Sequence, residues 1–209
     1  MIAIIDYEAG NLTSVSRALS YLGFDNEVTG SADTILKADR VIFPGVGAAG
    51  AAMLSLKRLG LDSLLKDVYQ SGKPLLGICL GTQIILGHSE EHDTPCLGII
   101  DGYVRLFDAS KKDDDGSDLK IPHMGWNRVK VLKEHPVLSG IRHDDEFYFV
   151  HSYYPAPSSP EHMLGSTCYG TEFASIIGCK NLIATQFHPE KSGRAGLNLL
   201  KNFCEWKPC

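Results

Sequence analysis

The 209-residue sequence lacks the features that mark several large classes of protein. No stretch approaches the roughly 20 consecutive apolar residues of a membrane span. The start, MIAIIDYEAGN, has no basic segment of the kind that opens a signal peptide. The net charge is −5, and nucleic-acid-binding proteins normally carry a basic excess. These absences predict a cytoplasmic protein that binds neither membranes nor nucleic acids.

The six cysteines lack the spacing of a metal site or of a disulfide framework. No two of them form a C-x-x-C pair, and no histidine stands at zinc-ligand spacing from a cysteine. We therefore expect no metal. Only Cys79 lies in a context that indicates chemistry. The others are interpreted as small buried side chains or surface thiols: Cys96, Cys168, Cys179, Cys204 and Cys209.

The chain has enough apolar residues, 44%, for one continuous core, and no linker or internal repeat divides it. We therefore expect a single domain over residues 1–209. Short apolar runs alternate with segments of helical period, which predicts an α/β fold with a mostly parallel central sheet flanked by helices. Buried strands are expected at 2–6, 41–43 and 74–79. Helices are expected at 12–22, 51–60, 61–72, 81–88 and 197–206.

The second half of the chain has a different pattern. Strand-like runs with clearer alternation predict additional strands in antiparallel pairs. These runs cover residues 102–107, 127–132, 146–154 and 182–189. The polar stretch 108–120 is interpreted as a solvated loop. For the first helix, Asn11 is a candidate cap and Gly23 a candidate terminator.

The stretch GICLG around Cys79 passes from a buried strand through a tight turn into a helix, as a nucleophile elbow does. Flanking glycines permit close packing and a strained backbone at the thiol. A helix N-terminus favours a thiolate and binds anions, and the N–H of Leu80 is aimed where an oxyanion would form. A buried cysteine in a plain turn remains an equal alternative on this stretch alone.

The stretch ATQFHPEKS (184–192) supplies a histidine and a carboxylate. Pro189 keeps His188 extended, and in an extended chain residues i and i+2 point to the same side. The Glu190 carboxylate can therefore orient the imidazole as a base for a thiol. The alternative is a histidine at a strand end paired with a surface glutamate.

The glycine-rich stretch FPGVGAAG (43–50) follows a predicted strand but lacks the spacing of either common phosphate-binding loop. It fits equally well a loop that offers a backbone N–H to a reacting carbonyl, or a plain turn. The three stretches together supply a nucleophile, a base, an orienting carboxylate and two candidate oxyanion donors in one chain.

The motifs PGVG, GICLGTQ, YFVHSYY and QFHPEKS, in this order and spacing, resemble the class I (triad) glutamine amidotransferases. DYEAGNLTSV and HMGWN narrow the resemblance to the family of glutaminase subunits of imidazole glycerol phosphate synthase. The resemblance covers essentially the whole chain. It implies the class I amidotransferase fold and hydrolysis of L-glutamine to glutamate and ammonia through a glutamyl thioester, without a cofactor.

The resemblance also implies roles for particular residues. Cys79, His188 and Glu190 form the catalytic triad, and the N–H groups of Gly47 and Leu80 hold the oxyanion. The implied glutamine-binding residues are Gly45, Gln83, Asp101, His151, Ser152 and Tyr153, with Asp101 receiving the substrate ammonium.

The resemblance further implies a heterodimer with a (β/α)8 cyclase subunit, which uses the ammonia to make imidazole glycerol phosphate and an aminoimidazole carboxamide ribotide. No barrel-like repeat follows the last helix, so the cyclase is expected to be a separate chain. The residues implied to face it are Asn11, Trp126, Tyr148 and Lys191.

Three alternatives remain open at the level of sequence. Closely similar subunits deliver ammonia to other acceptors, such as sugars of surface polysaccharides. Other α/β proteins with a cysteine elbow are peptidases or redox-type chaperones, which do not need the glutamate of HPE. A non-catalytic binding module is a third possibility, although the intact triad argues against it.

Overall fold

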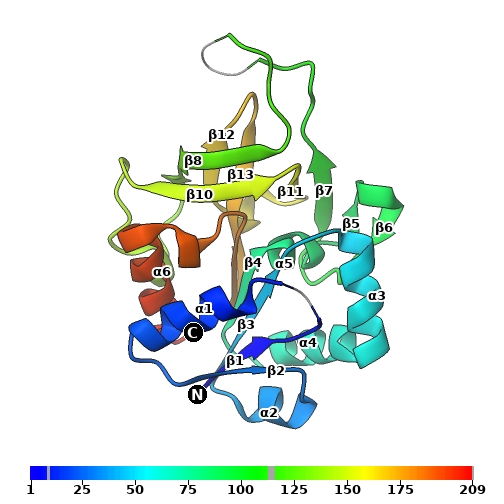
Figure 1. Cartoon of the computed structure of the whole chain (residues 1–209), viewed down its shortest axis with the longest axis vertical. Helices are drawn as coiled ribbons and strands as arrows, with labels where there is room; N and C mark the ends of the chain where they lie inside the picture. Colours follow the sequence, from blue (N-terminus) through cyan, green and yellow to red (C-terminus); the bar gives the residue numbers. More distant parts are fainter. Residues whose placement is uncertain (9, 113–115, 209) are drawn as a thin grey trace.

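A sheet of eight strands lies at the centre of the protein, in a computed structural model that describes residues 1–8, 10–112 and 116–208 (Figure 1). Its strand order is β2-β1-β3-β4-β14-β13-β12-β9. Helices cover both faces of this sheet, and two smaller sheets lie beyond the ends of β3 and β4 (Figure 1). The predicted fold class, a mostly parallel α/β sheet with added antiparallel strands, is confirmed.

Five strands form the parallel half of the sheet. They are β2 (Asn26–Thr29), β1 (Ile2–Ile5), β3 (Arg40–Gly45), β4 (Leu75–Cys79) and β14 (Leu182–Thr185). β1, β3, β4 and β14 read as continuous apolar runs because helices cover both of their faces. Strands were expected at each of these four places. β14 was expected among strands in antiparallel pairs; it lies parallel to β4 on one side and antiparallel to a neighbouring strand on the other.

The other half of the sheet is antiparallel. It consists of β13 (Glu172–Cys179), β12 (Met163–Cys168) and β9 (Lys130–Val131). β13 pairs with β14, so the two halves are continuous. The sequence analysis predicted neither β12 nor β13.

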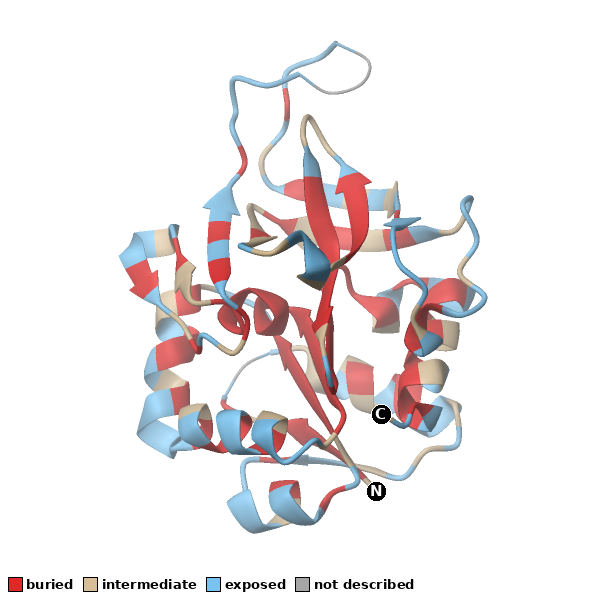
Figure 2. Cartoon of the chain, turned by 180° about the vertical axis from the view of Figure 1, so that it is seen from behind, coloured by how far each residue is buried: buried red, intermediate tan, exposed pale blue. Residues whose placement is uncertain are grey.

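Alternate residues of each parallel strand point to opposite faces and build two cores. On one face Ile2 and Ile4 pack with Val15 and Leu199, which brings α1 and α6 to that side. On the other face Ile5 packs among residues of the remaining helices. Figure 2 shows the buried strands between the half-exposed helices.

The helices are α1 (Leu12–Tyr21), α2 (Ala32–Lys37), α3 (Ala49–Leu59), α4 (Leu61–Gln70), α5 (Leu80–Ile84) and α6 (Gly193–Glu205). Each of the five predicted helices is present with shifted ends, and the sequence analysis did not predict α2. Gly23 follows α1 with a left-handed φ of 83°, as predicted for a terminator. Asn11 stands at the N-cap position of α1, but its side chain makes no capping hydrogen bond, so that prediction is wrong. Within the described ranges, no helix has the length and apolar character needed to cross a membrane.

Two smaller sheets complete the fold. One is an antiparallel ribbon of β8 (His123–Arg128) and β10 (Glu146–His151). The other contains β11 (Tyr153–Pro157), β7 (Gly102–Leu106), β5 (His88–Ser89) and β6 (Thr94–Pro95). The predicted strand 146–154 is therefore two strands in different sheets, and 127–132 is divided between β8 and β9. The described parts of the 108–120 stretch are mostly exposed, as expected for a loop; residues 113–115 lie outside the described residues.

Candidate active site

Cys79 lies at the sharp turn between β4 and α5, where the sequence predicts an elbow. Its backbone has φ 54° and ψ −106°, a conformation that costs a non-glycine residue of order 1–3 kcal/mol. The turn packs tightly against β3: a Cβ on Gly81 would lie 1.9 Å from the carbonyl oxygen of Phe43. A Cβ on Gly77 would lie 2.6 Å from Ile85. The two glycines therefore permit the strained turn that holds the sulfur at the strand end.

The helix after Cys79 is shorter than predicted. It covers Leu80–Ile84, five residues, instead of 81–88. A helix this short has only a small macrodipole. Its first N–H groups still have no partner within the helix. The Leu80 N–H, directly after the thiol residue, therefore makes no hydrogen bond within the helix.

Cys79 borders a cavity of about 380 Å³. Most of the residues that the sequence assigned to the site line this cavity: Gly47, Cys79, Leu80, Gln83, His151, Ser152 and Tyr153. Gly47 has φ 100°, a conformation that side chains rarely adopt, so glycine is required in this loop. The elbow, the glycine-rich loop and the HSY stretch meet around one space, although they are far apart in the sequence.

His188 and Glu190 lie together on the inner side of the elbow. The carboxylate Oε1 of Glu190 lies 2.8 Å from Nδ1 of His188, and the two side chains are 0% and 1% exposed respectively. His188 has an extended backbone, φ −97° and ψ 95°, which Pro189 favours. Because Oε1 of the carboxylate accepts from Nδ1, the other ring nitrogen, Nε2, is left to act as base or acid.

Nε2 of His188 is buried and makes no hydrogen bond of ordinary geometry with the described residues. Burial lowers the pKa of His188, but interactions with Cys79 and then Glu190 outweigh it and raise the pKa to about 9. Cys79 and Glu190 are therefore the two groups that stabilise the protonated imidazole. The raised pKa favours the form of His188 that can give a proton to a leaving group.

Two glutamine side chains form a chain of hydrogen bonds that ends at the sulfur. Nε2 of Gln186 donates to the Cys79 Sγ across 3.7 Å, and Oε1 of Gln186 accepts from Nε2 of Gln83 at 3.0 Å. Nε2 of Gln83 also donates to the carbonyl of Tyr153 at 2.8 Å. Both contacts of the Gln83 amide use its nitrogen, so its oxygen is the atom available to a ligand. The sequence analysis missed Gln186, although it stands two residues before His188.

His151 forms part of the cavity wall, but both of its ring nitrogens are occupied. Nδ1 donates to the carbonyl of Tyr153 at 2.7 Å, and Nε2 therefore accepts from Nδ1 of His123 at 3.0 Å. Burial and the neighbouring His123 lower the pKa of His151 to about 3. His151 is thus neutral at physiological pH and contributes shape and rigidity to the wall.

Two of the implied glutamine-binding residues lie outside the cavity lining. Gly45 is buried in β3, where a Cβ would lie 2.0 Å from the Tyr7 hydroxyl, so only glycine leaves room for it. Asp101 is exposed, and its backbone carbonyl accepts from the N–H of Ser158. Glu91, which the sequence analysis missed, lines the cavity instead. Its Oε2 accepts from the N–H of Ala49 at 2.6 Å, which fixes the carboxylate at the cavity rim.

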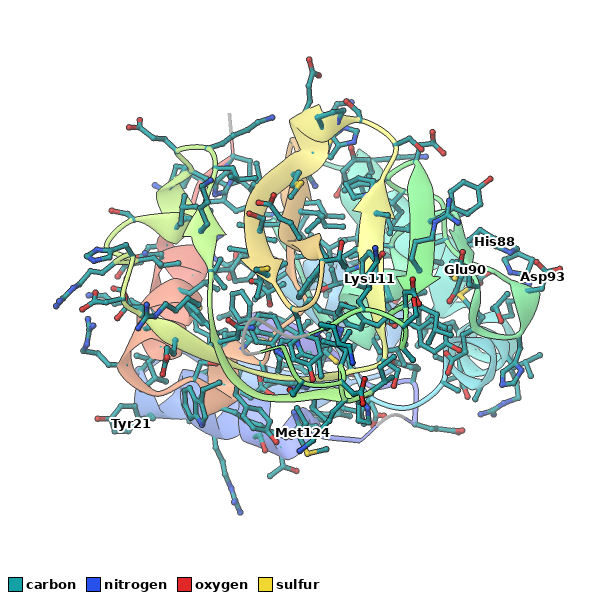
Figure 3. All side chains as sticks on the ribbon, turned by 90° about the horizontal axis from the view of Figure 1, so that it is seen from above. Tyr21, His88, Glu90, Asp93, Lys111 and Met124 are labelled. Atoms are coloured by element: carbon teal, nitrogen blue, oxygen red, sulfur yellow. The ribbon has the colours of Figure 1, made fainter. Side chains whose placement is uncertain are left out.

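The residues implied to face a partner divide into two groups. Trp126 and Tyr148 pair across β8 and β10 with ring centroids 6.0 Å apart, and Nζ of Lys191 lies 5.9 Å from the Tyr148 ring centre. Asn11 instead points inward, where Nδ2 donates to Oε1 of Glu190 at 2.6 Å. Beside the first group, Met124 on β8 points outward on the same side as Tyr21 of α1 (Figure 3).

The described residues contain no group of three or more His, Cys, Asp or Glu side chains that could hold a metal ion. The five described cysteines form no disulfide with one another, and Cys209 lies outside the described residues. The reactive groups are Cys79, which borders the cavity, and the buried pair of His188 and Glu190. A thiol with a carboxylate-held histidine is suited to nucleophilic attack on a carbonyl carbon.

Comparison with known proteins gives a consistent result. The family model of glutamine amidotransferase class-I matches residues 3–206. Imidazole glycerol phosphate synthase subunit HisH of Maridesulfovibrio salexigens is 52% identical over 206 residues, 99% of this chain and 97% of the relative. The subunit of the same name from Nitratidesulfovibrio vulgaris is 55% identical over 204 residues, 97% and 95% of the two chains. The solved structure of PurLQS from Thermotoga maritima is similar with a TM-score of 0.73 at 16% identity, covering 98% and 97%, and supports the fold alone.

Proposed function

This chain belongs to the class-I glutamine amidotransferase family, and from that premise we propose that Cys79, His188 and Glu190 hydrolyse L-glutamine to glutamate and ammonia. One observation carries the proposal. The strained cysteine borders a cavity, and a buried histidine held by a buried carboxylate has its pKa raised by Cys79 and Glu190.

The reaction proceeds in two halves. Sγ of Cys79 attacks the amide carbon of the substrate, and the N–H groups of Leu80 and Gly47 hold the resulting oxyanion. His188 protonates the departing nitrogen, and ammonia leaves a glutamyl thioester. Water, deprotonated by His188, then attacks the thioester, and the proton returns to the sulfur as glutamate departs. Glu190 keeps Nδ1 of the imidazole occupied, so that Nε2 carries every proton transfer.

Recognition of the amino-acid end of glutamine falls to the polar groups at the cavity rim. The Gln83 oxygen accepts from the substrate ammonium or amide, because its nitrogen is already committed. We assign the ammonium to Glu91 in place of Asp101, because Glu91 borders the cavity and Asp101 does not. Ser152 and Tyr153 complete the rim beside Glu91.

The chain is the glutaminase subunit of an imidazole glycerol phosphate synthase in histidine biosynthesis. This is supported by HisH relatives that are 52% and 55% identical over nearly the whole chain. Ammonia released into neutral water becomes ammonium, which is not a nucleophile. A (β/α)8 cyclase docked over the cavity would receive ammonia before protonation, and its products would be imidazole glycerol phosphate and the aminoimidazole carboxamide ribotide. The apolar pair Trp126 and Tyr148 beside Lys191 is the proposed contact surface.

The test is glutaminase activity measured with and without the cyclase subunit and its ligand. We expect a low rate alone and a marked increase in the complex. We expect Cys79→Ala to lower the stimulated rate at least about 1000-fold, because the nucleophile is lost. Cys168→Ala, which removes an exposed thiol, is the matched control and keeps full activity. Full activity of Cys79→Ala would refute the triad, and stimulation only by a sugar-amidating partner would refute the histidine-pathway assignment.

A further inference from the structure

We propose that Asn11 is a positioning residue of the triad: its side-chain amide holds the Glu190 carboxylate in the orientation that aligns His188. The inference rests on the proposed glutaminase function and deepens it. Asn11 begins the first helix, 179 residues before Glu190 in the sequence. Its role is therefore to join the N-terminal turn to the catalytic histidine through one carboxylate oxygen.

The contacts converge on a single atom. Oε1 of Glu190 accepts from Nδ2 of Asn11 at 2.6 Å and from Nδ1 of His188 at 2.8 Å. Hydrogen bonds to an ionised acceptor are shorter and stronger than those between neutral groups. The Asn11 contact has the short length expected of this kind of bond. The Glu190 side chain is fully buried, so water does not supply a substitute donor from bulk solvent.

The second oxygen of Glu190 offers no alternative anchor. Oε2 is buried and has no hydrogen-bond partner among the described residues. Glu190 also borders a surface cavity of about 430 Å³ between α1 and α6, lined by Ser14 and Gly193 among others. Without Asn11, the carboxylate would keep only its bond to His188, and it would be free to turn toward this cavity and to water.

The backbone of Asn11 supports the same conclusion. Its φ of 72° and ψ of 8° lie in the left-handed region, which glycine and asparagine tolerate best. Glycine would satisfy the backbone alone, so the backbone does not explain a side chain here. A helix-capping bond would not explain it either, because the amide donates to Glu190 and makes no cap. The remaining use of the side chain is to hold Glu190.

The amide is also chemically suited to this role. It donates a hydrogen bond to the carboxylate without adding charge beside the imidazole. Interaction with Glu190 is one of the causes that raise the pKa of His188. Loss of the anchor would weaken this interaction and lower the pH at which His188 loses its proton.

The experiment compares Asn11→Gly, which removes the amide at no backbone cost, with Asn11→Asp, which keeps the shape and loses the donor. Both are assayed alone and in the cyclase complex. For Asn11→Gly we expect kcat to fall roughly 10- to 100-fold with KM nearly unchanged, by the same factor in both states. The alkaline limb of its pH–rate profile moves to lower pH. For Asn11→Asp, the rate relative to the unaltered protein rises as the pH falls, because the protonated carboxyl group donates again.

Lys180→Gly is the matched control, since Lys180 also has a left-handed φ, 53°, but is exposed and lies outside the cavity lining. It should leave kcat and the pH profile unchanged. The proposal is overturned if Asn11→Gly keeps its unstimulated kcat and pH profile and loses only the response to the cyclase, because Asn11 would then act only at the interface. Failure of the glutaminase proposal itself would show separately, as full activity in Cys79→Ala.

Discussion

At the scale of single residues, the site depends on how a buried histidine keeps its proton. Burial alone would leave His188 neutral, but Cys79 and Glu190 raise its pKa to about 9. Because the folded pKa is raised, protonation contributes stability that is complete below the unfolded pKa of about 6.5 and is lost as the pH rises through about 9. His188 is therefore poised to protonate departing ammonia throughout the neutral range.

The assignment of the substrate ammonium to Glu91 gives a prediction at this scale. Glu91→Gln removes the negative charge while keeping the shape, so we expect KM for glutamine to rise roughly 10- to 100-fold with a smaller change in kcat. Asp101→Asn is the matched control, and it should leave KM unchanged because Asp101 is exposed and outside the cavity lining. Steady-state kinetics of the complex decide it, and a KM effect in Asp101→Asn alone would reverse the assignment.

At the scale of elements, the strand-to-helix turn around Cys79 is built on close backbone contact. β3 and β4 lie side by side with Gly45 opposite Cys79, and α5 begins directly above β3. Gly81 lets the first turn of α5 touch the Phe43 carbonyl. The geometry of the nucleophile is thus set by packing between two strands and a helix, and the thiol itself contributes little to it.

Gly81→Ala tests this packing. The added Cβ would overlap the Phe43 carbonyl oxygen, and backbone cannot move aside as a side chain can, so we expect the free energy of unfolding to fall by at least about 2 kcal/mol. Urea denaturation measures the change. Gly50→Ala in α3 is the control; its Cβ would meet only the Thr94 hydroxyl at 3.4 Å, so stability should hold or rise slightly. Equal stability of the two variants would contradict the packing account.

Local pattern was sufficient to predict β1, β3, β4 and the elbow, because their signals are contained within a few residues. It failed for the hairpin of β12 and β13. Six successive residues of β13, 173–178, are buried, and a short apolar run without alternation does not separate a strand from a helix. β12 contains Gly165 and Ser166, which are buried only because both neighbouring strands pair with it.

Local sequence pattern was also insufficient for part of the candidate site. Sequence pattern singled out Cys79, His188 and Glu190 as candidates because each lies in a short motif with a mechanical meaning. Glu91 lies next to Glu90 in an acidic stretch, and no local signal distinguishes the one that borders the cavity. That choice depends on where the turn after β5 meets the loop after β3, which is a tertiary contact.

At the scale of the whole molecule, the cavity opens beside a surface with unusually large exposed apolar side chains. The outer face of the β8–β10 ribbon carries Met124 and Trp126, which are 62% and 54% exposed, with Tyr148 and Val150 opposite them. Val150 also lines the cavity, so the ribbon connects the outer face to the site. A docked cyclase would cover this face and the cavity together, which would keep ammonia from water.

Trp126→Ala tests this surface. An exposed tryptophan that becomes buried in an interface is a common hot spot, and its truncation costs about 2 kcal/mol or more, equivalent to a roughly 30-fold rise in Kd for the cyclase. The unstimulated glutaminase rate should stay the same, because Trp126 does not line the cavity. Calorimetric titration with the cyclase measures Kd, and Tyr103→Ala, on the exposed face of β7, is the control. A loss of unstimulated activity with unchanged Kd would mean that Trp126 supports the site from within the chain, and that the cyclase docks on another face.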